Sequence, residues 1–136
     1  MTATISSRLA ESTDSLLRFV MRADAVLSGL TGIALVLFAH QVAEMSGTTA
    51  AIEYTVGASF IVFAVAVLAL AARPSIRTSG LILAVGNALF SVATVVVVVA
   101  GVWPLTTTGV VLVLGTGVYT LVMAELQYQG VRRISR

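Results

Sequence analysis

Apolar residues gather in four long stretches of the chain, and polar residues fall between them. The stretches are residues 25–43, 54–72, 80–101 and 105–126. Each approaches the roughly 20 residues that a helix needs to cross a bilayer. The valines at 95–99 would favour a strand in water, but inside lipid the backbone must satisfy its own hydrogen bonds, so a helix is expected. The pattern predicts an all-α, four-helix transmembrane bundle with up-down-up-down topology, in which residues 1–136 form a single integral membrane domain.

The first 22 residues are more polar than the spans but still carry helix signals. Ser12 or Thr13 can cap a helix, and Asp14 suits its positive end. An apolar face follows, made of Leu16, Leu17, Phe19 and Val20. Two interpretations are open: an amphipathic helix lying at the membrane interface, or a simple extension of the first span. For the first span itself, a cleaved signal peptide is the competing interpretation, and the long polar segment before it opposes that interpretation.

The basic residues orient the chain. All eight are arginines, at positions 8, 18, 22, 73, 77, 132, 133 and 136. A four-span topology puts every one of them on the same side of the membrane, because the loops 44–53 and 102–104 contain none. Loops rich in Arg remain in the cytoplasm. We therefore expect a multi-pass protein of the cell inner (plasma) membrane with both termini cytoplasmic and residues 127–136 as a cytoplasmic tail.

Composition excludes several classes of function. Hydrophobic residues make up 58% of the chain and charged residues 10%, against about 25% charged in a soluble domain. The net charge is only +2, with no basic stripe interleaved with aromatics, so nucleic acid is not an expected partner. The chain has no cysteine, which excludes disulfides, thiolate metal sites and thiol redox chemistry. The expected partners are the lipid bilayer and further membrane-protein chains, as a homo-oligomer or larger complex.

Three polar side chains are expected at one depth inside the membrane. A helical rise of about 1.5 Å per residue places Thr31, Asn87 and Tyr119 near the same level of three different spans. Hydrogen bonds between such groups commonly hold membrane helices together. The cluster predicts interhelical packing, and the alternative is a polar lining for a cavity or for the headgroup of a lipophilic molecule.

Two carboxylates stand at the predicted inner edge of the membrane. Asp24 precedes the first span, and Glu125 lies near the end of the fourth. Arginines lie close to them in the sequence or in the neighbouring loop, at Arg22, Arg77, Arg132 and Arg133. This arrangement predicts an ion-pair network at the inner edge. The alternative is a proton or cation site, because ionisable groups at membrane depth are candidates for function.

No pattern for catalysis is present. His40 and Glu44 stand one helical turn apart and Glu53 follows, but one histidine without a second strong ligand is a poor metal site. The sequence offers no nucleophile beside a base and no phosphate-binding loop. We expect a non-enzymatic protein with no cofactor and no metal.

Two segments resemble a known group of proteins. They are "RADAVLSGLTG" at Arg22–Gly32 and "AELQYQGVRR" at Ala124–Arg133. They are similar to small, uncharacterised four-span bacterial membrane proteins, and the similarity extends over most of the chain. The resemblance implies the four-span topology and brings no established activity. Together with the composition it favours a structural or accessory role, and the alternative is a small transporter or lipophile-binding protein that uses the Asn87 and Tyr119 level.

The arginine distribution predicts the outcome of a topology experiment. Reporters fused after residues 47, 76 and 136 should report the outer side, the cytoplasm and the cytoplasm, respectively. Paired reporters that are active on only one side of the membrane make the measurement. A signal from the outer side for the fusion at residue 136 would contradict the four-span topology.

Overall fold

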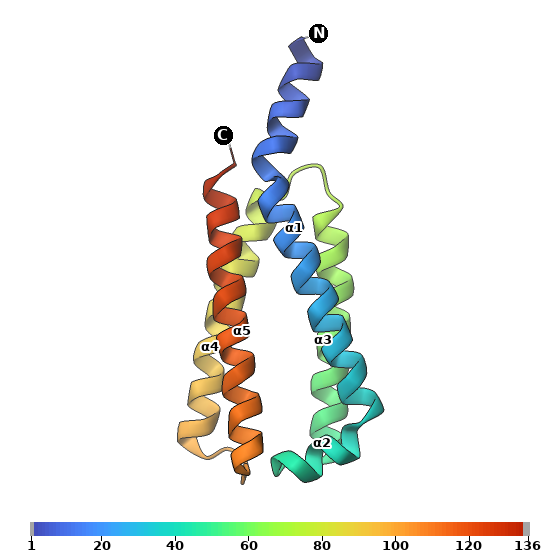
Figure 1. The fold of residues 1–136 in the computed structure, drawn as a ribbon, viewed down its shortest axis with the longest axis vertical. Coiled ribbons are helices and arrows are strands. Elements are labelled where there is room, and N and C mark those ends of the chain that lie inside the picture. The colour runs from blue at the N-terminus through green and yellow to red at the C-terminus, as the bar shows by residue number, and fades with distance from the viewer. Residues whose placement is uncertain (1, 135–136) are drawn as a thin grey trace.

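The described residues of the chain form five helices. The computed structural model describes residues 2–134, with side chains from residue 13 onward. The helices are α1 (Thr2–Leu37), α2 (Ala39–Ser46), α3 (Ala50–Ala71), α4 (Arg77–Ala100) and α5 (Thr107–Arg132). The four long helices run alternately in opposite directions, and short α2 lies at the turn between α1 and α3 (Figure 1). Both termini lie at the same end, which we call the termini end.

Four of the helices are long and apolar enough to cross a membrane. The apolar stretches are Thr13–Leu37 within α1, Ala50–Ala71, Arg77–Ala100 and Thr107–Arg132. Only 22% to 28% of each apolar window is buried inside the bundle, so most of its side chains face outward. Large apolar side chains on the outside, such as Phe19, Val62 and Val99, would be unfavourable in water and suit lipid. The fold is that of a multi-pass integral membrane protein.

The bundle consists of two helical hairpins. α1 packs most extensively on α3, and α4 packs on α5. α1 and α3 approach closely where Gly32 faces Gly57: a Cβ added to Gly32 would lie 2.6 Å from the Gly57 carbonyl oxygen. α4 and α5 approach at Gly117, beside the Thr94 hydroxyl. Small residues allow this proximity, which gives membrane helices their packing energy.

The two hairpins meet near the termini end, where α1 contacts α5 most. Leu17 of α1 is fully buried there, between Gly80 of α4 and Gly130 of α5. A side chain at Gly80 would displace the leucine side chain, and one at Gly130 would collide with the backbone of α1 at Leu17. Leu17 belongs to an apolar core that also contains Ala71 of α3, Leu83 of α4 and Val131 of α5, so residues from every long helix stabilise this junction.

The opposite end is joined by backbone contacts. The Thr106 N–H donates to the Ser46 carbonyl over 3.1 Å, and the Thr106 hydroxyl donates to the Met45 carbonyl. Gly47 ends α2 with a φ of 79°, in the left-handed region that favours glycine, and a side chain there would collide with the Pro104 carbonyl. α2 therefore connects the first hairpin to the start of α5.

The helix bounds differ from the predicted spans at two places. The predicted span 25–43 ends inside α2, because the first long helix stops at Leu37. α1 is continuous across residues 13–25, so of the two open interpretations the extension of the first span describes the observed helix. α5 continues to Arg132, and residues 127–132 of the predicted tail are therefore helical. At the start of the first span and at the end of the fourth, polar residues within a membrane-length helix led the prediction to place the boundary inside the observed helix.

The close approach of α1 and α3 predicts different effects of adding one methyl group at two glycines. Gly32→Ala should lower the free energy of unfolding by ~1–3 kcal/mol, because the new Cβ meets a backbone oxygen that cannot move away. Gly86→Ala is the matched control, since a Cβ there meets nothing within 4 Å. Thermal unfolding of both variants in the same detergent tests this. Equal stability of the two would contradict the packing described.

Candidate functional site

The most unusual side chain in the bundle is Asp24. It lies in the apolar stretch of α1 and has no exposed surface. Arg18, six residues earlier, contacts the last carbonyl of α3, so Asp24 lies about 9 Å deeper into the bundle than that helix end. The sequence placed Asp24 at the entrance to the first span. In the structure it is a buried carboxylate within the span.

Neutral side chains from three helices surround the carboxylate. Oδ1 accepts hydrogen bonds from the Tyr119 hydroxyl of α5 over 2.8 Å and from the Ser28 hydroxyl of α1 over 3.2 Å. Oδ2 accepts from the Gln127 amide of α5 over 2.9 Å and from the Asn87 amide of α4 over 3.2 Å. Asn87 also donates to the Gln127 side-chain oxygen over 2.8 Å. We call these five residues the Asp24 cluster.

The expected ion pairs at the inner edge are not formed among the described side chains. Asp24 accepts from neutral groups, although Arg22 lies two residues away, because the side chain of Arg22 is exposed on the outside of α1. Glu125 is exposed and accepts from Gln129 of its own helix over 2.8 Å. The remaining predicted partners lie elsewhere: Arg132 stacks over the Tyr128 ring, Arg133 is exposed, and the Nε of Arg77 is buried without a hydrogen-bond partner.

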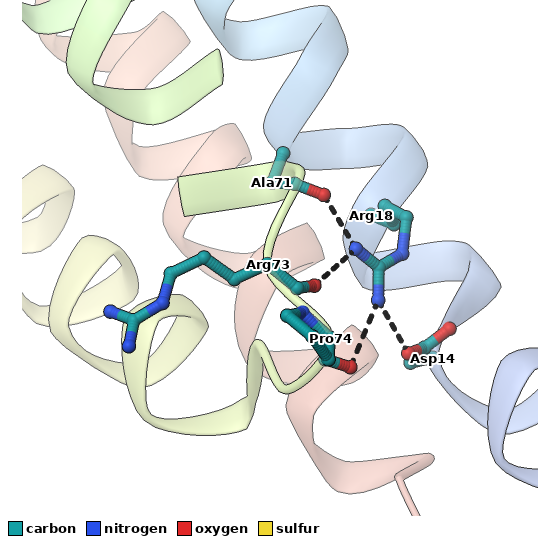
Figure 2. Close-up of polar contacts among 5 residues, drawn as sticks. All are labelled: Asp14, Arg18, Ala71, Arg73 and Pro74. Carbon is teal, nitrogen blue, oxygen red and sulfur yellow. Dashed lines mark hydrogen bonds and ion pairs between the residues drawn. The ribbon is translucent and has the colours of Figure 1, made fainter. Parts of the chain in front are cut away.

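The ion pair that the structure does form is between Arg18 and Asp14. Their side chains are 2.8 Å apart on successive turns of α1. Arg18 also donates to the carbonyl oxygens of Ala71, Arg73 and Pro74, while the Arg73 side chain extends away from it (Figure 2). A cation at carbonyls left free by a helix end is favourable. Arg18 therefore attaches the loop after α3 to α1.

The structure brings together two of the three polar residues predicted at one depth. Asn87 and Tyr119 both contact Asp24, from different helices. Thr31 is exposed, and its hydroxyl donates to the Leu27 carbonyl of the same helix. Toward its α2 end, α1 moves away from α5, as Figure 1 shows.

The candidate metal residues at the opposite end do not converge. The His40 ring contacts the Tyr54 ring edge-on, and Glu53 accepts from the Thr48 hydroxyl over 2.8 Å. Glu44 is exposed. Within the part of the chain that the structure describes, no three His, Cys, Asp or Glu side chains could hold a metal together.

Sequence reasoning missed Gln127 and Ser28. Gln127 is fully buried, but it was assigned to the tail because it follows the last apolar residues. Its spacing of eight residues from Tyr119, a little over two turns, places both on one face of α5 and could have identified it. Ser28 is one turn after Asp24, the spacing at which two helical side chains meet.

A buried carboxylate that accepts only neutral donors can do two things chemically. It can hold three helices together by hydrogen bonds, or it can gain and lose a proton within the bundle. Comparison with protein-family models, curated proteins and solved structures finds no match to this chain. The interpretation of the site therefore depends on its geometry.

The Asp24 cluster predicts a specific loss of stability. Asp24→Ala should lower the free energy of unfolding by ~1–3 kcal/mol, because the donors of Asn87, Gln127 and Tyr119 remain buried without their shared acceptor. Glu125→Ala, the exposed carboxylate on α5, should change it by less than ~0.5 kcal/mol. Thermal unfolding in lipid nanodiscs measures both. An Asp24→Ala protein as stable as the parent would contradict a role in holding the helices.

Proposed function

We propose that this protein is a non-enzymatic, structural or accessory component of a membrane, acting within a homo-oligomer or a larger membrane-protein complex. The proposal rests on one observation: the polar groups of the Asp24 cluster form hydrogen bonds with one another. The carboxylate oxygens, the amide nitrogens of Asn87 and Gln127, the Gln127 side-chain oxygen and the Tyr119 hydroxyl are each engaged within the cluster. A site for a transported solute needs polar groups that are free to receive it.

Two further observations support this role over that of a small transporter or lipophile-binding protein. Among the described residues, the buried side-chain atoms without a hydrogen-bond partner are Ser46 Oγ and Arg77 Nε, and neither belongs to the cluster. A groove of about 690 Å³ runs along α3, lined by Tyr54, Thr55, Ala58, Ser59, Val62 and Phe63. None of these lining residues belongs to the cluster, so the groove offers no route to Asn87.

Co-purification of two differently tagged copies tests the proposal. Both full-length copies are expressed together in the native host and extracted from the membrane directly into polymer nanodiscs, and one is captured by its tag. We expect the second copy, or another membrane protein at fixed stoichiometry, to accompany it. Membranes from cells that express each copy separately, mixed before extraction, control for association after lysis.

One result would contradict this proposal. A captured chain that is monomeric by mass, carries no stoichiometric protein and drives uptake of a solute into proteoliposomes would overturn the accessory role. The uptake would then assign a transport function to the same protein.

A further inference from the structure

The two oxygens of the Asp24 carboxylate have chemically different partners. Oδ2 faces the amide N–H groups of Asn87 and Gln127, which can only donate. Oδ1 faces the hydroxyls of Tyr119 and Ser28, which can either donate or accept. A proton on Oδ2 would point at two N–H groups, which cannot accept a hydrogen bond. A proton on Oδ1 would point at a group that can reverse its role.

We propose that Asp24 is a reversible proton-binding site of this membrane protein, with Oδ1 as the atom that takes up the proton. The ligand is a single proton supplied by water, and its binding converts the carboxylate into a neutral carboxylic acid. The new O–H bond donates to the Tyr119 oxygen, 2.8 Å away. Release reverses the step, and no other bond changes.

The Tyr119 hydroxyl has a second acceptor already in place. The backbone carbonyl oxygen of Asp24 lies 3.4 Å from the Tyr119 oxygen. When Oδ1 is protonated, the Tyr119 hydrogen turns from Oδ1 to this carbonyl, and its oxygen then accepts from the carboxylic acid. Asn87 and Gln127 continue to donate to Oδ2 in both states. Both charge states therefore keep their hydrogen bonds, which a purely structural carboxylate does not require.

The same side of the carboxylate is the one that can exchange a proton. Asp24, Asn87 and Gln127 are buried, whereas Ser28 and Tyr119 are partly exposed. The hydroxyl side of the carboxylate therefore lies nearer the surface of the bundle, while the amide side is closed by packed helices.

Among the described side chains, no cationic group pairs with Asp24. From α5 the titratable group that faces it is Tyr119, and from α4 it meets the uncharged Asn87. The α3 residues in the adjoining core, such as Val67, are apolar. Glu125 is exposed and held by Gln129, and Arg22 is exposed. An anion in an apolar bundle without a cationic partner is costly.

Infrared difference spectroscopy on the full chain in phosphatidylcholine vesicles tests the proton site. The chain has two aspartates, so in Asp14→Asn protein with a ¹³C-labelled aspartate carboxyl group the label on the remaining carboxyl reports on Asp24. We expect a carbonyl band of a protonated acid that shifts with the label and that appears and disappears reversibly with pH. The label leaves Asp24 in place, so the test does not require a variant at that position to fold.

Two variants of the labelled Asp14→Asn protein test whether Oδ1 is the atom that takes up the proton. Tyr119→Phe should shift the frequency of the band, because the protonated Oδ1 loses its acceptor, and Glu125→Gln should leave the band unchanged. A labelled band that is absent, or constant, at every pH at which the protein stays folded would overturn the proton site. An unchanged frequency in Tyr119→Phe would overturn the assignment of Oδ1. Neither result depends on whether the protein is an accessory component, since no partner takes part in the measurement.

Discussion

One buried carboxylate must be satisfied inside an apolar bundle, and the arrangement of three helices depends on it. Asp24 of α1 accepts hydrogen bonds from Asn87 of α4 and from Tyr119 and Gln127 of α5. Each hairpin is held together internally by the close packing of its two long helices. Since hydrogen bonds are directional and packing is not, Asp24 defines the register of α1 against the second hairpin.

The number of long helices could be predicted from the sequence, and their bounds only in part. Apolar length alone identifies the four spans, because a helix must cross a fixed thickness of hydrocarbon. The first span was placed at 25–43, whereas its apolar stretch is Thr13–Leu37. Arg18, Arg22 and Asp24 looked like a boundary. In the structure Arg18 binds carbonyls and Asp24 binds donors, and both interactions depend on neighbours that are distant in sequence.

The misplacement of the first span also explains which part of the site could be predicted. The depth estimate placed Asn87 and Tyr119 at one level, where each contacts Asp24, because their spans were nearly in register with the observed helices. It assigned Thr31 of the first span to this level, but the residue there is Asp24, seven residues earlier. Seven residues are about two helical turns, so Asp24 lies on nearly the same side of α1 at the depth where α5 is adjacent. Gln127 was missed because the fourth span was ended at residue 126, although its spacing from Tyr119 places it on the same face of α5.

The contacts of the hairpins at both ends have a mechanical consequence. Leu17 joins them near the termini, and the α2 segment joins them at the opposite end through Ser46 and Thr106. Because these two attachments lie at opposite ends of the bundle, neither hairpin can pivot away from the other. We expect a structural change midway between the attachments to rotate the helices about their long axes, without altering the overall shape of the molecule.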